Sequence, residues 1–117
     1  ITGDIVCDGE RVGHISLAEK LHKLTEAGKK VYIITGTHDL HPEPKGYSNE
    51  KGEYVVEGCT RQELEEIYGD FGFNDAIAKH PQTFSYVSQL DEKTRLLALN
   101  ENDCNYSSPL ACPKPCL

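Results

Sequence analysis

Apolar residues near the start of the chain recur at helical spacing. Leu17, Leu21 and Leu24 stand at positions i, i+4 and i+7, and mostly polar residues separate them. This spacing places the three leucines on one face of a helix. Gly28 is typical of the position just after a helix ends. The pattern therefore predicts a helix over residues 14–28, with its leucine face packed against the rest of the domain.

A short β-branched run at residues 31–34 follows this helix and is typical of a buried strand. Ile1 and Thr2 have the character of the last residues of an earlier strand, so we expect the numbering to begin inside a longer chain. The order strand, helix, strand predicts a parallel βαβ unit with helices covering the sheet. Polar loops at residues 3–4 and 36–39 follow the two strands. We expect these loops to meet, because open α/β sheets bind ligands at the carboxyl ends of their strands.

The middle of the chain combines an irregular stretch with a clear helix start. Residues 41–58 are rich in proline, glycine and charge, which predicts a long excursion with one weak hairpin around residues 49–52. Thr60 and Glu63 have the spacing of a capping box, which predicts a helix over residues 60–68. Asn74 is a candidate cap for a short helix that ends at residue 78.

The last part of the chain predicts a β-hairpin and then a tail. Residues 83–90 show the two-residue periodicity of a strand, and residues 95–99 are its expected partner across a turn. Residues 101–117 are polar and then rich in proline and cysteine. We therefore divide the chain into a domain over residues 1–100 and a tail over residues 101–117. A disulfide, reduced thiols or a zinc site are all open for the tail cysteines Cys104, Cys112 and Cys116.

Composition and charge narrow the classes of function. The chain has 117 residues, of which 38% are hydrophobic, and this suits one domain with a small core. Its net charge is −7, so we expect no binding to a nucleic-acid backbone, which needs a basic face. The chain has neither a polybasic anchor nor an apolar run of about 18 residues, so we expect no membrane span. The cysteine content leaves the compartment open, and the oligomeric state is open as well.

The residues best suited to chemistry lie in the two polar loops. Asp4 follows a glycine that permits a tight turn, and its carboxylate is a hard oxygen ligand for divalent metals. His38 can act as a ligand or a proton donor, and Asp39 can fix the tautomer of that imidazole. Each residue also has a plain structural interpretation: Asp4 as a turn cap, His38 as a solvated loop residue and Asp39 as an N-cap.

The remaining histidines and Cys7 have weaker claims. His14 and His22 are expected on or beside the helix surface, His41 in the loop after the candidate site, and His80 at a helix end. Cys7 lies near Asp4 and could act as a nucleophile with His38 as its base. We favour the simpler interpretation, in which the Gly-Asp pair already accounts for this loop.

Two sequence segments together resemble the calcineurin-like metallophosphoesterases. Residues 3–10 (GDIVCDGE) are similar to the Gly-Asp loop of that family, and residues 31–39 (VYIITGTHD) to its strand and Gly-Asn-His-Asp/Glu loop. The likeness continues less specifically through the later helix and strand pair, to about residue 100. It implies an α/β fold in which this chain forms part of an αββα sandwich, with the parallel βαβ unit followed by a helical segment and a β-hairpin.

The resemblance also implies roles for four residues. Asp4 matches the carboxylate that bridges two metal ions, and Thr37 stands where the family has the Asn ligand of the second metal. His38 matches the histidine that contacts the phosphate and assists the leaving group, and Asp39 its orienting partner. The implied cofactors are two divalent ions, Mn, Fe or Zn, and the implied substrate is a small-molecule phosphate ester.

This chain departs from the family pattern in ways that shape the functional hypothesis. A Thr hydroxyl is a poorer neutral ligand than an amide oxygen, and the family's Asp-x-His and Gly-His-x-His motifs are absent from the 117 residues. We therefore predict a phosphodiesterase or phosphatase site that is incomplete, and a chain that is inactive alone. The alternative is a non-catalytic α/β domain that serves as a binding or interaction module. A third interpretation, a small cysteine-stapled secreted domain, fits the helix and strand pattern less well.

Overall fold

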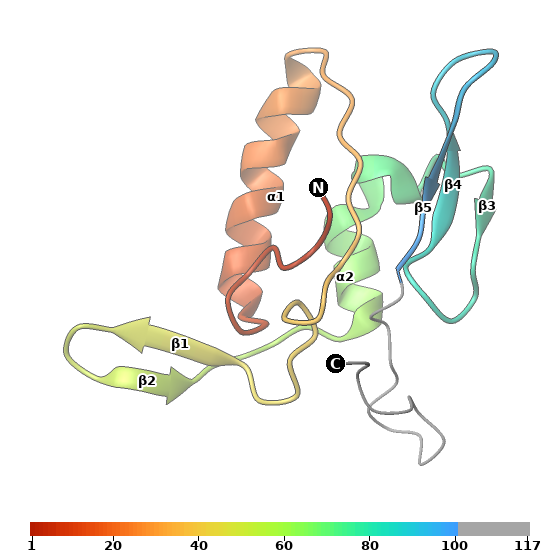
Figure 1. Ribbon diagram of the computed structural model, residues 1–117. Helices are drawn as coiled ribbons and strands as arrows, with labels where there is room; N and C mark the ends of the chain where they lie inside the picture. The colour runs from red at the N-terminus through yellow and green to blue at the C-terminus, as the bar shows by residue number, and fades with distance from the viewer. Residues whose placement is uncertain (101–117) are drawn as a thin grey trace.

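The computed structural model describes residues 1–100, and these form a mixed α/β domain (Figure 1). The α/β class predicted from the sequence is therefore confirmed at that level. The tail over residues 101–117, with its three cysteines, lies outside the described residues. In chain order the elements are α1 (Arg11–Glu26), β1 (Lys45–Ser48), β2 (Gly52–Val55), α2 (Arg61–Tyr68), the π-helical turn η1 (Gly69–Phe73), β3 (Ala78–Lys79), β4 (Tyr86–Gln89) and β5 (Arg95–Ala98).

Helix α1 begins three residues earlier than the leucine spacing predicted. It ends as expected before Gly28, which has φ +78° and donates its N–H to the Thr25 carbonyl, a left-handed stop that suits glycine. The buried face consists of His14, Ala18 and Leu21, whereas the side chain of Leu24 is 48% exposed. The buried stripe is thus shifted towards the helix N-terminus.

His14 is fully buried, which corrects its expected surface position. Its Nδ1 lies 2.8 Å from the Tyr68 hydroxyl, and its Nε2 donates to the Asp39 carbonyl at 3.0 Å. Because a carbonyl only accepts, Nε2 carries the proton, and Nδ1 accepts from Tyr68. A buried imidazole is tolerated here because both of its nitrogens have partners. His14 thereby joins α1 to α2 and to the candidate site loop.

The predicted pair of parallel strands is reduced to one isolated bridge. Thr2 and Ile34 form a parallel bridge, and the Ile34 N–H donates to the Ile1 carbonyl at 3.1 Å. The predicted strand at residues 31–34 does not form. The physical reason is that the N–H and carbonyl of Ile33 bond to a turn carbonyl and a side-chain hydroxyl, and not to the backbone of a neighbouring strand. Its N–H donates to the Phe71 carbonyl at 3.1 Å, and its carbonyl accepts from the Tyr86 hydroxyl at 2.8 Å.

The capping box predicted for α2 is present. The Thr60 hydroxyl accepts from the Glu63 N–H, and the Glu63 carboxylate accepts from the Thr60 N–H. The short helix expected after Asn74 is absent. Instead, the Asn74 N–H donates to the Gly69 carbonyl at 2.7 Å and closes η1, while residues 78–79 pair with β4 as strand β3. Cross-strand pairing therefore overrides the local capping signal.

Both predicted hairpins form, in separate sheets. β1 and β2 pair antiparallel and project from the body of the domain, whereas β3, β4 and β5 form a three-stranded antiparallel sheet (Figure 1). β2 is exposed along its whole length. An isolated two-stranded hairpin is marginal in water, so the β1–β2 hairpin depends on its attachment to the rest of the domain.

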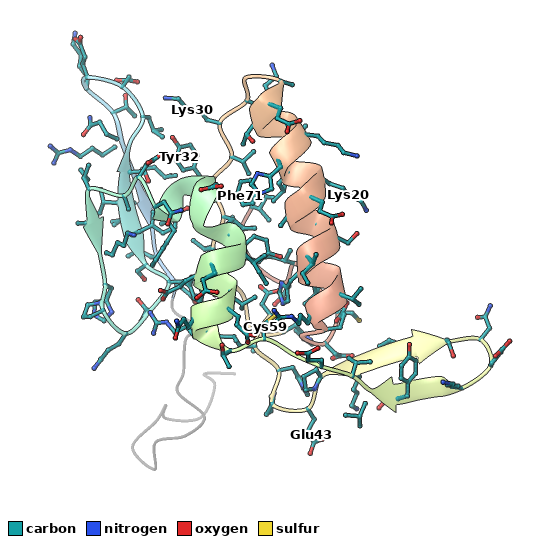
Figure 2. All side chains as sticks on the ribbon, turned by 180° about the vertical axis from the view of Figure 1, so that it is seen from behind. Lys20, Lys30, Tyr32, Glu43, Cys59 and Phe71 are labelled. Atoms are coloured by element: carbon teal, nitrogen blue, oxygen red, sulfur yellow. The ribbon has the colours of Figure 1, made fainter. Side chains whose placement is uncertain are left out.

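The core lies between α1, α2 and the three-stranded sheet. Leu64, Phe71 and Tyr86 are among its fully or almost fully buried side chains. Figure 2 shows Phe71 between the two helices and Lys20 on the outer face of α1. Within residues 1–100, no helix is long and apolar enough to span a membrane.

The burial of His14 predicts that the folded domain loses stability in mild acid. Burial lowers its pKa below the ordinary value of about 6.5, so the unfolded chain binds a proton that the folded chain resists. Above that value His14 contributes no pH dependence. Below it, stability should fall by at most about 1.4 kcal/mol per pH unit until the folded-state pKa is reached. Urea unfolding between pH values of about 7.5 and 5.5 would measure the slope.

The test variant is His14→Gln, and His80→Gln is its matched control. His80 is exposed, so its replacement should leave the pH slope unchanged, whereas His14→Gln should remove part of it. The comparison uses slopes, because His14→Gln also changes packing and lowers stability at every pH. Equal slopes in the parent chain and His14→Gln would show that this imidazole is not the acid-sensitive group.

Candidate functional site

The two polar loops predicted to meet are in close contact. A Cβ atom added to Gly3 would lie 2.7 Å from Gly36 Cα, and one added to Gly36 would lie 2.4 Å from the Asp4 N atom. Neither position has room for a side chain. Gly3 and Asp4 also have positive φ values, +91° and +48°, which mark the sharp turn after the Thr2–Ile34 bridge. The glycines therefore let the Asp4 loop and the His38 loop pack backbone to backbone.

Asp39 ties these two loops together, and this corrects its predicted role. Its Oδ1 accepts the N–H groups of Ile5 at 2.7 Å and Val6 at 3.1 Å, and its Oδ2 accepts the Gly36 N–H at 2.6 Å. The side chain is fully buried. Both oxygens are thus engaged with backbone, so Asp39 positions the loops and does not orient the His38 imidazole.

Asp4 and Thr37, the predicted metal ligands, are both exposed beside this junction. The Asp4 Oδ1 atom accepts the His38 N–H at 3.1 Å, which sets the carboxylate against the start of the second loop. The structure therefore brings Asp4 and the backbone of His38 together, as the order of the loops predicted. Thr37 precedes His38 in the same loop, and its side chain is open to solvent.

His38 has a defined tautomer. Its Nδ1 lies 2.8 Å from the Cys7 carbonyl, and because a carbonyl only accepts, Nδ1 carries a proton. In the neutral ring Nε2 is then the basic atom. The side chain is 52% exposed, so this face of the ring is open to a ligand. The imidazole can gain and release a proton at Nε2 while Nδ1 stays anchored.

Asp8 is the carboxylate beside His38, and the sequence patterns did not single it out. Its Oδ1 lies 3.6 Å from His38 Nδ1, and its Oδ2 accepts a hydrogen bond from the hydroxyl of Tyr47 on β1. That bond from Tyr47, with smaller contributions from His38 and His41, lowers the pKa of Asp8. The same bond raises the pKa of Tyr47 to about 12, which keeps the phenol a donor.

The position of Asp8 in the Asp4 loop was an available signal, whereas nothing in residues 41–58 pointed to Tyr47. Asp8 stands four residues after Asp4 in a loop already expected to face the second one. Tyr47 reaches Asp8 only through the register of the β1–β2 hairpin and its attachment to the Asp8 loop. Such long-range placement leaves no local pattern.

The donor set of residues 1–100 is too small for a complete two-metal centre. Asp4 supplies an exposed carboxylate of the hard oxygen type that divalent ions prefer, and Thr37 a neutral hydroxyl. Both Asp39 oxygens already accept backbone N–H groups. Over this range, no group of three or more His, Cys, Asp or Glu side chains is arranged to hold a metal ion. Further ligands would be required for a complete centre.

No protein-family model matches the chain, and no curated protein matches it. The functional proposal therefore rests on the contacts between the two loops and on the chemistry of their side chains.

Proposed function

We propose that the chain carries part of the active site of a metal-dependent phosphoric ester hydrolase of the calcineurin-like type. In this proposal, Asp4 is a metal ligand, Thr37 a weak second ligand, and His38 the group that contacts the phosphoryl oxygens. The proposal extends to the fold, in which the Thr2–Ile34 bridge and α1 belong to the βαβ unit of a larger αββα sandwich. The substrate is a small-molecule phosphate ester, bound where the two loops meet.

The observation that carries the proposal is the contact between the Gly3-Asp4 turn and the loop over residues 36–39. The two loops resemble the family motifs independently, and they are 32 residues or more apart in the chain. Their packing is close enough to exclude a Cβ atom at Gly3 or Gly36, and the His38 N–H donates to Asp4. A metal ligand and a proton donor on such adjacent loops suit attack on a bound ester.

The chemistry assigned to this chain is proton transfer by His38. With Nδ1 held by the Cys7 carbonyl, Nε2 is the atom able to give a proton to the departing oxygen of the ester. An anionic phosphoryl group would be attracted to the protonated ring, which carries a positive charge at an exposed position. The metal ions, when bound, would supply charge stabilisation and an activated water. Among residues 1–100, no group of three or more His, Cys, Asp or Glu side chains is arranged to hold them.

A non-catalytic binding module is the second candidate, and one observation favours it. Both Asp39 oxygens accept backbone N–H groups, and Thr37 stands where the family has a stronger ligand. Among the described residues, Asp4 is therefore the one exposed carboxylate at the junction that could be a strong metal ligand. A site of that kind could bind a phosphate ester through His38 without cleaving it.

Hydrolysis of bis(4-nitrophenyl) phosphate with Mn²⁺ tests the two candidates. We expect little turnover by the 117-residue chain and metal-dependent turnover by the protein expressed from its complete reading frame. In that protein, His38→Ala should lower kcat by roughly 10²- to 10⁴-fold with a smaller effect on KM. No metal-dependent turnover in the complete protein would favour the binding module. Turnover by the short chain that survives His38→Ala would refute the assigned site.

Calorimetry of metal binding gives a separate prediction for Thr37. The 117-residue chain should bind Mn²⁺ weakly, because only Asp4 is a strong ligand. Thr37→Asn should tighten binding by up to about tenfold, equivalent to about 1.4 kcal/mol, since an amide oxygen is a better neutral ligand. Thr37→Ala is the matched control and should not tighten binding. Tight binding of two ions that is lost on Asp4→Ala would contradict our assignment of the ligand set.

A further inference from the structure

The hairpin β1–β2 is anchored to the Asp8 loop at its base. The Lys45 N–H donates to the Asp8 carbonyl at 3.3 Å, and Gly58, just after the hairpin, bridges to Glu10. The Arg11 N–H also donates to the Glu57 carbonyl at 2.9 Å. These bonds hold the base of an otherwise projecting element against the loop that carries Asp4 and Asp8 (Figure 1). The hairpin is therefore placed to act on the candidate site.

One side chain of the hairpin reaches the site itself. Tyr47 donates its hydroxyl proton to the Asp8 Oδ2 atom, while the other carboxylate oxygen faces His38 Nδ1 at 3.6 Å. Asp8 is mostly buried at this point, with a side-chain exposure of 16%, whereas Tyr47 is 55% exposed. The carboxylate thus stands between a phenol on the hairpin and an imidazole on the loop, with one oxygen directed to each.

We propose that Tyr47 and Asp8 are positioning residues for His38, and that the hairpin β1–β2 sets the orientation of this imidazole through them. The Tyr47 hydroxyl holds the Asp8 carboxylate in one rotamer. In that rotamer Asp8 and the Cys7 carbonyl lie together beside Nδ1, so the ring has one orientation and Nε2 is presented to solvent. The contribution to catalysis rests on the proposed function, but the orientation of the ring does not.

The proposal assigns to Asp8 the orienting role that Asp39 cannot fill, since both Asp39 oxygens bind backbone N–H groups. It also gives the exposed hairpin a function. A small hairpin is costly to order unless it is tied down, and the hydrogen bond between Tyr47 and Asp8 does this at the site. Loss of the Tyr47 hydroxyl should then change the orientation of the His38 ring through Asp8, without a direct hydrogen bond between Tyr47 and His38.

The test is nuclear magnetic resonance of the His38 ring in the ¹⁵N-labelled 117-residue chain. At about pH 8, the unmutated 117-residue chain should show the Nδ1–H tautomer in one conformation. Tyr47→Phe removes only the hydroxyl, and it should shift or broaden the ring resonances and lower the population of that tautomer. Asp8→Asn should cause a larger change of the same kind.

Tyr54→Phe is the matched control, because Tyr54 is an exposed tyrosine on the partner strand, paired with Gly46. It should leave the His38 signals unchanged. Unchanged His38 signals in both Tyr47→Phe and Asp8→Asn would overturn the proposal, as would an equal change in Tyr54→Phe. Because Tyr47 is exposed, Tyr47→Phe should fold even if Asp8→Asn does not.

Kinetics on the protein from the complete reading frame supply the second readout. Tyr47→Phe should lower kcat, by up to the roughly 100-fold that a displacement of about 1 Å can cause, and leave KM nearly unchanged. A change in KM alone would show that Tyr47 binds substrate and does not position His38. The ring signals could respond as expected while the unmutated protein from the complete reading frame has no activity. In that case the positioning of His38 stands and the proposed hydrolase function fails.

Discussion

Replacing Asp39 by alanine is expected to remove most of the free energy of unfolding of the chain at 25 °C. The substitution removes the acceptor for three backbone N–H groups, those of Ile5, Val6 and Gly36. Two of these belong to the Asp4 loop and one to the His38 loop, so the same change releases both sides of the junction. A small side chain in place of the fully buried carboxylate would offer these donors no substitute partner.

The expected loss is about 3–5 kcal/mol. A hydrogen bond to a charged group contributes about 1.5–3 kcal/mol, and the three bonds share one acceptor group, so their contributions do not simply add. Small domains are stable by about 5–15 kcal/mol, and the modest core of this chain argues for the lower end of that range. A loss of this size is therefore enough to populate the unfolded state.

Urea unfolding monitored by circular dichroism measures the effect, with two comparison variants. Asp39→Asn keeps one acceptor oxygen of the same shape and should lose less stability than Asp39→Ala. Asp75→Ala removes an exposed carboxylate and should change stability by less than about 0.5 kcal/mol. An unfolding midpoint for Asp39→Ala close to that of Asp75→Ala would show that Asp39 does not join the two loops.

Local patterns predicted the elements whose bonds are local. The Thr60 capping box and the antiparallel pairing of β4 with β5 depend on residues close in sequence, and both are present. The leucine spacing predicted α1 but assigned its buried face incorrectly. His14 takes an inward position because its partners, Tyr68 and the Asp39 carbonyl, arrive from elsewhere in the chain. No local pattern distinguishes such a histidine from a solvated one.

The candidate site also has features that local sequence patterns predict and features that depend on long-range contacts. The meeting of the Asp4 loop and the His38 loop could be predicted, because the expected strand, helix and strand order places both loops after the carboxyl ends of neighbouring strands. The partners of each carboxylate could not be predicted from the sequence. Asp39 follows His38 directly in sequence yet binds backbone N–H groups, while Asp8 lies 30 residues from His38 in sequence and 3.6 Å from its Nδ1. Side-chain direction depends on the packed loops, which sequence adjacency does not describe.

The second large effect is expected from Gly36→Ala, which tests the loop junction without removing any polar side chain. A Cβ at this position would lie 2.4 Å from the Asp4 N atom and 2.5 Å from Asp4 Oδ1, distances that real Cβ contacts do not show. Because the nearest atom belongs to the backbone, no rotamer change relieves the clash. The Asp4 loop must move away, and the hydrogen bond from the His38 N–H to Asp4 should break.

Gly28→Ala separates this clash from the general cost of replacing a glycine. Gly28 has φ +78°, so alanine there is strained, but a Cβ would meet nothing within 4 Å. We expect Gly28→Ala to lose about 1 kcal/mol and Gly36→Ala about 3 kcal/mol, in the range of overpacked sites. Amide hydrogen exchange should show faster exchange at His38, Ile5 and Val6 in Gly36→Ala alone. Protected amides at these positions in Gly36→Ala would mean that the two loops are not in contact, and the proposed phosphoesterase site would lose the observation on which it rests.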